Sequence, residues 1–354
     1  MSINIPSLFG INRSNRDFLQ SDSWGKNQFN SSFPASLACY MNHMNINPVY
    51  LKLDEHLSIS NTEISVAELF GISAESRDLF FSFESPFTPY QQLLIGNLPR
   101  IDLVTQNRDS GNCLTGLEIK LTALPDHTTC SLADDQFGSE LVIRPDTIVY
   151  LACSIAIKYR NNLQELVNII GDDFDAIADW TEPSNVIHYI PEMVNVIKTI
   201  FVSDITGQQP LVMQPVWKTR GKSPELAENC LDIFVWSNFA FSRLFLDSAN
   251  NGITSISRHI RTIIWLFKML FDFSKNGQFN HQRIIDTLSY NTKNDKAFSV
   301  NGIVTHPYMR CDRLTLPSIT KDEIKHIILG GGQTLLSPER RFDAIIYNSP
   351  ELFN

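Results

Sequence analysis

Two short stretches decide the fold: PRIDLV at residues 99–104 and GLEIKLT at residues 116–122. Each alternates polar with aliphatic side chains, which is the period-two pattern of a half-buried β-strand. Residues 105–115 between them include Asn, Asp, Ser and Gly, which favour a turn. The sequence therefore predicts a β-hairpin.

This hairpin would carry three charged side chains on one face: Asp102, Glu118 and Lys120. Because strand side chains alternate, Lys120 shares the face of Glu118, while Ile119 points into the core. Two carboxylates can bind a divalent cation that neutralises a phosphodiester and activates water, and a nearby lysine can position that water or the phosphate. The pattern predicts a metal-dependent nuclease, and an ordinary hairpin with a solvated charged face is the alternative.

The spacing alone is weak, because a chain with 38 acidic residues contains acid-x-Lys triplets by chance. A second triplet, Glu323-Ile324-Lys325, follows Asp312. Thr320 and Glu323 have the spacing of a helix capping box, and Gly330 would end that helix. Residues two apart on a helix point in different directions. We therefore expect a capped surface helix there and assign catalysis to the first triplet.

The sequence around the first triplet resembles a known family. Pro99-x-x-Asp102 followed by GLEIKLTALPD at residues 116–126 is similar to the PD-(D/E)xK nuclease superfamily, and specifically to the HindVP family of type II restriction endonucleases. The stretches SLFG (residues 7–10), NRDF (15–18) and SWGKNQFNSSFP (23–34) also resemble this family, so the resemblance covers most of the chain. Arg100 and Ile101 separate Pro99 from Asp102, which departs from a literal Pro-Asp pair but leaves the Asp assignment intact.

The resemblance implies a fold, an activity and a site. The fold would be α/β, a restriction-endonuclease-like core with a mixed central sheet flanked by helices, in one domain over residues 1–354. Asp102 and Glu118 would bind Mg²⁺, Lys120 would position the nucleophile, and members of the family recognise the partly degenerate palindrome GRCGYC. We expect cleavage of both strands of double-stranded DNA by a homodimer, since two-fold symmetric sites suit two-fold symmetric proteins. A cognate DNA methyltransferase would accompany the enzyme.

Two other functions remain open from the sequence. One is a DNA repair or junction-resolving nuclease of the same fold, and the other is a DNA-binding or protein-interaction module with a catalytically inactive hairpin. Glu68 and Glu84 precede the hairpin and are candidates for a third metal ligand, although each can equally be a surface acid.

The rest of the sequence predicts the helices and strands that surround the hairpin. We expect helices at residues 34–45, 62–70, 86–95 and 146–159, and strands at residues 49–53, 140–144 and 210–218. Beyond Lys222 we expect helices from Ser223 or Pro224 to about residue 247 and from Ser255 to about residue 273. The catalytic core would span about residues 60–222 and a mainly helical extension about 223–354. The dense apolar stripes of the extension predict either core or a dimer interface.

A net charge of −9 argues against a strongly basic, nonspecific nucleic-acid coat but does not exclude DNA, because local clusters govern phosphate contact. Basic clusters occur at Lys218, Arg220 and Lys222, at Arg258 and Arg261, at Arg310 and Arg313, and at Arg340 and Arg341. Arg can pair with guanine and Asp can accept from cytosine. Two groups are therefore candidate DNA-binding residues: Gln214, Lys218 and Arg220 beside a strand, and Arg310, Asp312 and Arg313 in a loop.

The six cysteines show no paired framework, which predicts a reduced, cytoplasmic location, and the family resemblance implies that the cell is bacterial. Cys113, His127 and Cys130 form a weak zinc candidate that lacks a clear fourth ligand. The most apolar run, residues 260–273, is interrupted by charged residues, so we expect no membrane segment.

Overall fold

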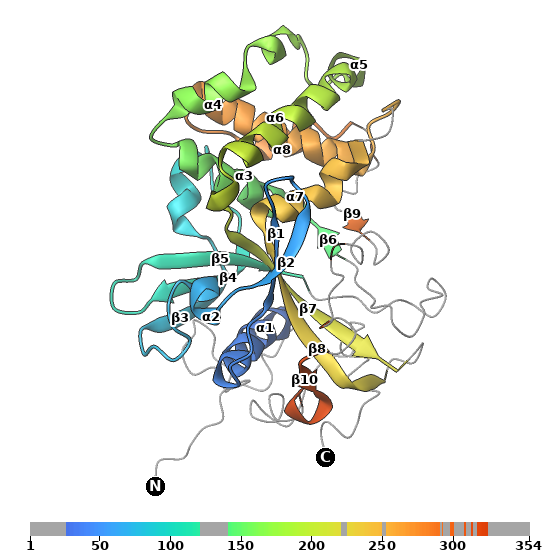
Figure 1. Cartoon of the computed structure of the whole chain (residues 1–354). Helices are drawn as coiled ribbons and strands as arrows, with labels where there is room; N and C mark the ends of the chain where they lie inside the picture. The colour runs from blue at the N-terminus through green and yellow to red at the C-terminus, as the bar shows by residue number, and fades with distance from the viewer. Residues whose placement is uncertain are drawn as a thin grey trace.

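The computed structural model describes residues 26–120, 141–220, 225–249, 253–290, 292, 298–300, 308, 313 and 317–324. Within these residues a central mixed sheet lies between two layers of helices (Figure 1). The mixed α/β architecture predicted from the sequence is confirmed.

Seven strands of the central sheet follow one path, and an eighth pairs beside it, within the described residues. Their order is β2 (Ile59–Glu63), β1 (Val49–Leu53), β8 (Leu226–Ser237), β7 (Pro210–Thr219), β5 (Cys113–Ile119), β4 (Ile101–Asn107) and β3 (Leu79–Ser85), with β10 (Ile319–Thr320) on β8. Two neighbouring pairs, β1 with β8 and β5 with β7, are parallel. The other pairs are antiparallel.

The predicted hairpin is formed by β4 and β5, whose antiparallel register joins Leu103 to Leu117. Its turn is stabilised by Asn107, whose side-chain oxygen accepts from the Ser110 amide at 3.0 Å. Gly111 has a φ of +68°, a left-handed conformation that favours glycine. Local turn chemistry and strand alternation therefore produce this hairpin.

A layer of helices covers the face of the sheet that carries Val104 and Val212. It contains α3 (Pro145–Tyr159), α4 (Leu163–Ile170), α6 (Ile190–Ser203), α7 (Asn238–Leu246) and α8 (Arg258–Asn276). Helix α8 begins after its capping residue Ser257, ends at Gly277 with a φ of +71°, and contacts α3, α4, α6 and α7. The apolar stripes of α7 and α8 are therefore used in the core of this protein.

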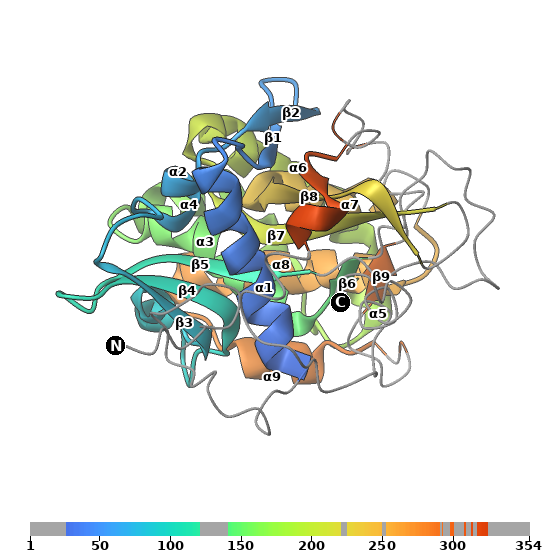
Figure 2. The same cartoon turned by 90° about the horizontal axis from the view of Figure 1, so that it is seen from below.

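The opposite face of the sheet is covered by α1 (Lys26–His43) and α2 (Val66–Phe70). Figure 2 shows α1 crossing this face, away from the α3–α8 layer. Leu37 and Met41 of α1 belong to one apolar cluster with Leu103, Leu117 and Ile119 of the hairpin. The hairpin is thus held by an apolar layer on the side opposite to its acids.

Smaller elements complete the described part. They are α5 (Pro183–Val186), α9 (His281–Thr287), the 3-10 helices η3 (Thr88–Leu93), η4 (Asp173–Ala176), η5 (Ile187–Tyr189), η6 (Ile205–Gly207) and η7 (Asp247–Ala249), and a separate two-stranded sheet of β6 (Leu141–Ile143) and β9 (Phe298–Val300). No helix in the described ranges combines the length and apolarity needed to cross a bilayer.

The helix predicted from Ser223 or Pro224 to about residue 247 is wrong. Strand β8 occupies Leu226–Ser237, and α7 begins only at Asn238. The second half of β8 is buried on both faces, so its apolar run lacks alternation and cannot be distinguished by periodicity from a buried helix. Strand β1 precedes and β8 follows residues 60–222, the predicted catalytic core, yet both strands lie in the central sheet.

Three further expectations need correction. The predicted helix at residues 62–70 overlaps the end of β2, and α2 begins after Ser65. The predicted helix at 86–95 is the short 3-10 helix η3. The predicted strand at 140–144 exists as β6, but it pairs with β9 outside the central sheet, because pairing partners are set by tertiary contacts.

Candidate active site

Three acidic residues lie on adjacent strands at the same level of the sheet. The β4–β5 register, continued by one residue, puts Asp102 opposite Glu118. The β3–β4 register pairs Phe83 with Leu103 and Ser85 with Ile101, which puts Glu84 beside Asp102. Directly opposed residues in an antiparallel pair share a face. We name Glu84, Asp102 and Glu118 the acid row.

Asp102 is partly buried, and its Oδ2 accepts a hydrogen bond from the Ile119 amide at 2.7 Å. Loss of water around it and the negative charge of Glu118 raise the pKa of Asp102 to about 7, opposed by the positive charge of Lys120 and the Ile119 hydrogen bond, with Glu84 raising it further. Asp102 and Glu118 therefore repel each other and share Lys120 as a positively charged neighbour. Such mutual repulsion is typical of a site that receives a cation.

Glu118 and Lys120 are buried, with exposed fractions of 6% and 8%. Lys120 Nζ donates to Oε1 of Glu118, and the same oxygen accepts from Thr147 Oγ1 at 3.1 Å. The Lys120 amide donates to the Met213 carbonyl of β7 at 2.9 Å, so β7 fixes the main chain just beyond β5. The structure thus brings Asp102, Glu118 and Lys120 together, although the pair Glu118–Lys120 is more enclosed than a solvated hairpin face would be.

Helix α3 contributes to this site, and reasoning from the sequence missed it. Thr147 lies in its first turn and contacts Glu118. The neighbouring Asp146 keeps contact with solvent, and surrounding protein together with the negative charge of Glu118 raises the pKa of its carboxyl. Pro145 signals a helix start. No local signal says which strand that helix end will meet.

Of the two candidates for a third metal ligand, Glu84 belongs to the acid row and Glu68 does not. Its φ of +49° is a left-handed conformation at the end of β3, and its charge acts on Asp102. Glu68 is exposed and forms a capping box with Ser65 at the start of α2, which lowers the pKa of Glu68. Across the described ranges, three or more His, Cys, Asp or Glu side chains do not converge as a ready metal cluster.

The zinc candidate is only partly covered by the described residues. Cys113 lies on β5, where its Sγ is 3.4 Å from Thr88 Oγ1. His127 and Cys130 lie outside the described residues.

The candidate DNA-binding residues Gln214 and Lys218 on β7, and Arg220 just after it, differ from one another in exposure. Gln214 is fully buried, and its Oε1 accepts from Trp236 Nε1 at 2.8 Å, so it is not accessible to a base edge here. Lys218 is half-buried, and Arg220 is exposed but paired with Glu225 at 2.9 Å. The amide of Gln214, predicted to contact DNA, therefore lies in the interior of the protein.

Arg313 forms hydrogen bonds within the protein. Its Nε and Nη2 donate to the two carboxylate oxygens of Asp232, at 2.9 and 2.5 Å, and Asp232 is only 1% exposed. The Arg313 Nη1 also donates to the Asn47 carbonyl. This bidentate pair ties Arg313 to β8. Lys222, Arg310, Asp312, Arg340 and Arg341 lie outside the described residues.

The prediction that Arg258 and Arg261 form a basic cluster for phosphate contact is wrong for Arg261. This residue is 1% exposed, lies over the ring of Trp265 at 4.5 Å and donates to Thr292 Oγ1. Spacing of three on a helix indicates a common face but not whether that face is solvated.

The second triplet has the predicted capping box. The Glu323 carboxylate accepts from the Thr320 amide at 2.6 Å, and the Thr320 hydroxyl accepts from the Glu323 amide at 3.3 Å. Residues 321–324 are helical, and Tyr40 donates to Glu323 at 3.0 Å. Lys325 and Gly330 lie outside the described residues. Glu323 therefore has a structural role at a helix start.

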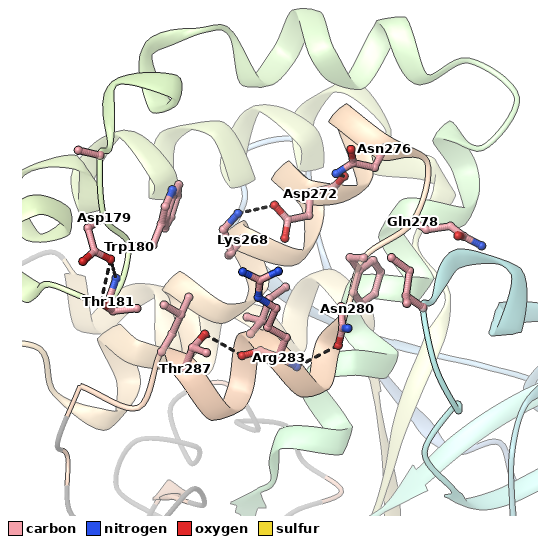
Figure 3. Close-up of a pocket in the computed structure, with 15 residues that line it drawn as sticks. Asp179, Trp180, Thr181, Lys268, Asp272, Asn276, Gln278, Asn280, Arg283 and Thr287 are labelled. Carbon is pink, nitrogen blue, oxygen red and sulfur yellow. Dashed lines mark hydrogen bonds and ion pairs between the residues drawn. The ribbon is translucent and has the colours of Figure 1, made fainter.

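A separate cavity of about 480 Å³ lies between α8, α9 and residues 178–181 (Figure 3). Several of its polar groups bind one another: Lys268 pairs with Asp272, and Asp179 accepts from the amide and hydroxyl of Thr181. Arg283 extends from α9 toward this hollow. The acid row does not line it, so the cavity is distinct from the candidate active site.

Comparison with known proteins agrees with the geometry. The family model for the HindVP restriction endonuclease matches residues 24–353. The chain is 50% identical over 350 residues to the probable type II restriction enzyme HindVP of Haemophilus influenzae, covering 98% of this chain and 95% of that protein. It is 46% identical over 352 residues to the type II restriction enzyme HgiDI of Herpetosiphon aurantiacus, covering 99% and 98%. A comparison with solved structures gave no match. The chain therefore belongs to the HindVP restriction endonuclease family.

Proposed function

We propose that this protein is a Mg²⁺-dependent type II restriction endonuclease that hydrolyses both strands of a short palindromic DNA site. Asp102, Glu118 and Lys120 are its catalytic residues. The observation that carries this assignment is the contact of Lys120 with Glu118 beside the partly buried Asp102, in a chain of this family. Two carboxylates that can bind a divalent cation, with a lysine beside them, suit metal-assisted hydrolysis of a phosphodiester.

The two carboxylates fit a hard divalent cation. Mg²⁺ binds through one or two carboxylates and keeps other positions for water and phosphate. Asp102 Oδ2 accepts from Ile119, and Glu118 Oε1 accepts from Lys120 and Thr147. The hydrogen bonds found among the described residues do not engage Asp102 Oδ1 or Glu118 Oε2, which are the oxygens we assign to the cation. The raised pKa of Asp102 supports this fit, because it arises partly from the charge of Glu118.

Each group then has a separate task. When bound, Mg²⁺ would neutralise phosphate charge and lower the pKa of a water molecule. Lys120 Nζ, held by Glu118, orients the attacking water and stabilises the negative charge that develops on the phosphate. Burial of Glu118 and Lys120 strengthens these interactions because less water screens them.

We further propose that the site is GRCGYC, that a homodimer cuts it, and that a cognate DNA methyltransferase protects the host. The sequence resemblance supports the site, and the symmetry of a palindrome supports the dimer. Because α7 and α8 are buried within one chain, the dimer would use a surface other than their apolar stripes.

The test is digestion of unmethylated plasmid DNA with and without Mg²⁺, followed by sequencing of the fragment ends. Discrete fragments that end within GRCGYC support the proposal. Nicking that depends on DNA structure would instead indicate a repair or junction-resolving nuclease. Specific binding without cleavage would indicate an inactive module, and full activity in excess EDTA would contradict the metal requirement.

A further inference from the structure

A helix residue reaches the candidate metal ligand from outside the hairpin. Thr147, in the first turn of α3, is 0% exposed, and its hydroxyl donates to Oε1 of Glu118 at 3.1 Å. Lys120 Nζ donates to the same oxygen. One oxygen of Glu118 thus has two donors, one neutral and one charged.

The position of this hydroxyl is fixed by the way α3 meets the hairpin. Tyr150 lies three residues after Thr147, on the same side of the helix. Its hydroxyl donates to the Pro99 carbonyl at 2.7 Å and accepts from the Phe87 amide at 3.1 Å. Pro99 precedes Asp102 by three residues. The first two turns of α3 are therefore attached both to the segment that leads into Asp102 and to Glu118 itself.

A glutamate carboxylate turns easily about its last side-chain bond, because that torsion has a broad, roughly two-fold profile. Two donors on Oε1 restrict this rotation. The Thr147 hydroxyl does so without adding positive charge, so the carboxylate keeps the negative charge that attracts a cation. A second lysine at this place would weaken cation binding.

We propose that Thr147 is a positioning residue that holds Oε1 of Glu118 so that Oε2 is presented to the divalent cation. This inference rests on the proposed function, since it takes Glu118 as a metal ligand. Residues that orient metal ligands typically change metal affinity or activity by about 10–100-fold when they are replaced.

The test compares the full-length protein with Thr147→Val and Thr147→Ser in cleavage assays titrated with Mg²⁺. Valine keeps the shape of threonine but removes the hydroxyl, and serine keeps the hydroxyl but removes the methyl group. We expect Thr147→Val to raise the Mg²⁺ concentration for half-maximal cleavage by about tenfold or more, and Thr147→Ser to stay within about twofold of the parent. Thermal unfolding of each variant reports the structural effect separately.

An unchanged Mg²⁺ requirement in a folded Thr147→Val variant would overturn the inference, even if its melting temperature fell. Equal shifts in the valine and serine variants would also overturn it, because packing rather than the hydroxyl would then be responsible. If Thr147→Val does not fold, Thr147→Cys replaces it, because the cysteine side chain is similar in size to serine but its thiol is only a weak donor. A Mg²⁺ requirement of Thr147→Cys equal to that of Thr147→Ser would then refute the role of the hydroxyl.

Glu118→Gln separates this inference from the proposed function. Loss of cleavage in Glu118→Gln with normal behaviour of Thr147→Val defeats only the inference. Normal cleavage by Glu118→Gln defeats the assignment of Glu118 and the inference with it.

Discussion

The Ile119 amide donates to Oδ2 of Asp102 across 2.7 Å, so a side chain of the acid row bonds to the strand that carries its partners. Ile119 lies between Glu118 and Lys120 and directs its own side chain into the opposite apolar layer. Any shift of β5 relative to β4 would therefore move Asp102 out of alignment with both residues. The strand register and the catalytic geometry are set by the same contacts.

The first prediction concerns pH and metal binding. Asp102 has a pKa of about 7, above its ordinary value of 3.8, so the folded metal-free protein keeps a proton that the unfolded chain loses between these values. The contribution of this group to the free energy of unfolding is thus fully present below about pH 4 and is lost as pH rises through 7. A cation needs the ionised carboxylate, so its affinity should increase with pH up to about 7, by at most about tenfold per unit.

Calorimetric titration with Ca²⁺ at pH values below, at and above 7 measures this change without cleavage. Asp102→Asn is the control, and its residual binding should lose this pH dependence. An affinity of the parent protein that does not vary over this range would refute the competition between proton and metal at Asp102.

The second prediction separates a structural role of Gln214 from a base-reading role. Gln214→Met should lower the free energy of unfolding by about 1–3 kcal/mol, because it leaves the buried Trp236 N–H without its acceptor. The cleavage site should not change. Urea unfolding and sequencing of cut ends measure the two effects. Relaxed specificity with unchanged stability would show instead that Gln214 contacts DNA.

The third prediction concerns the Arg313–Asp232 pair. Arg313→Met leaves a buried carboxylate unpaired and should destabilise the protein by about 3–5 kcal/mol. Adding Asp232→Asn should restore much of this loss, because the uncompensated charge is removed. The matched control is Arg220→Met, whose exposed pair with Glu225 should contribute no more than about 1 kcal/mol. Similar small effects for both arginines would contradict a structural role for Arg313.

The hairpin and its three charged residues could be predicted from the sequence because their determinants are local. Alternation sets each strand, turn residues join them, and Asp102 and Lys120 are separated by only 18 positions. The capping box at Thr320 and Glu323 is predictable for the same reason. A short segment contains everything that these features require.

Thr147 could not be identified in this way, and Glu84 could not be distinguished from Glu68 as a third metal ligand. Thr147 reaches Glu118 only because α3 meets the hairpin in three dimensions, and Glu84 joins the acid row through the pairing of β3 with β4. The same limit explains β8, whose burial on both faces removes the alternation that identifies a strand. It also explains Gln214, because an amide in a polar-looking segment can be entirely internal. Burial depends on the whole fold.

The fourth prediction concerns the competing triplet. Glu323→Ala should reduce stability by about 1 kcal/mol through loss of the capping box while cleavage stays near normal. Thermal unfolding measures the first effect and plasmid digestion the second. Loss of cleavage in a fully folded Glu323→Ala protein would move the catalytic assignment toward this segment.

The most direct test of the central claim is Mg²⁺-dependent plasmid cleavage by Asp102→Asn, Glu118→Gln and Lys120→Met, each checked for folding by thermal unfolding. We expect all three variants to lose cleavage, because each removes a metal or transition-state contact. Specific DNA binding should persist in the two acid variants, where repulsion of phosphate is reduced. Lys325→Ala, the matched variant of the other triplet, should cut normally. Retained cleavage by Lys120→Met together with its loss in Lys325→Ala would contradict the assignment of the active site.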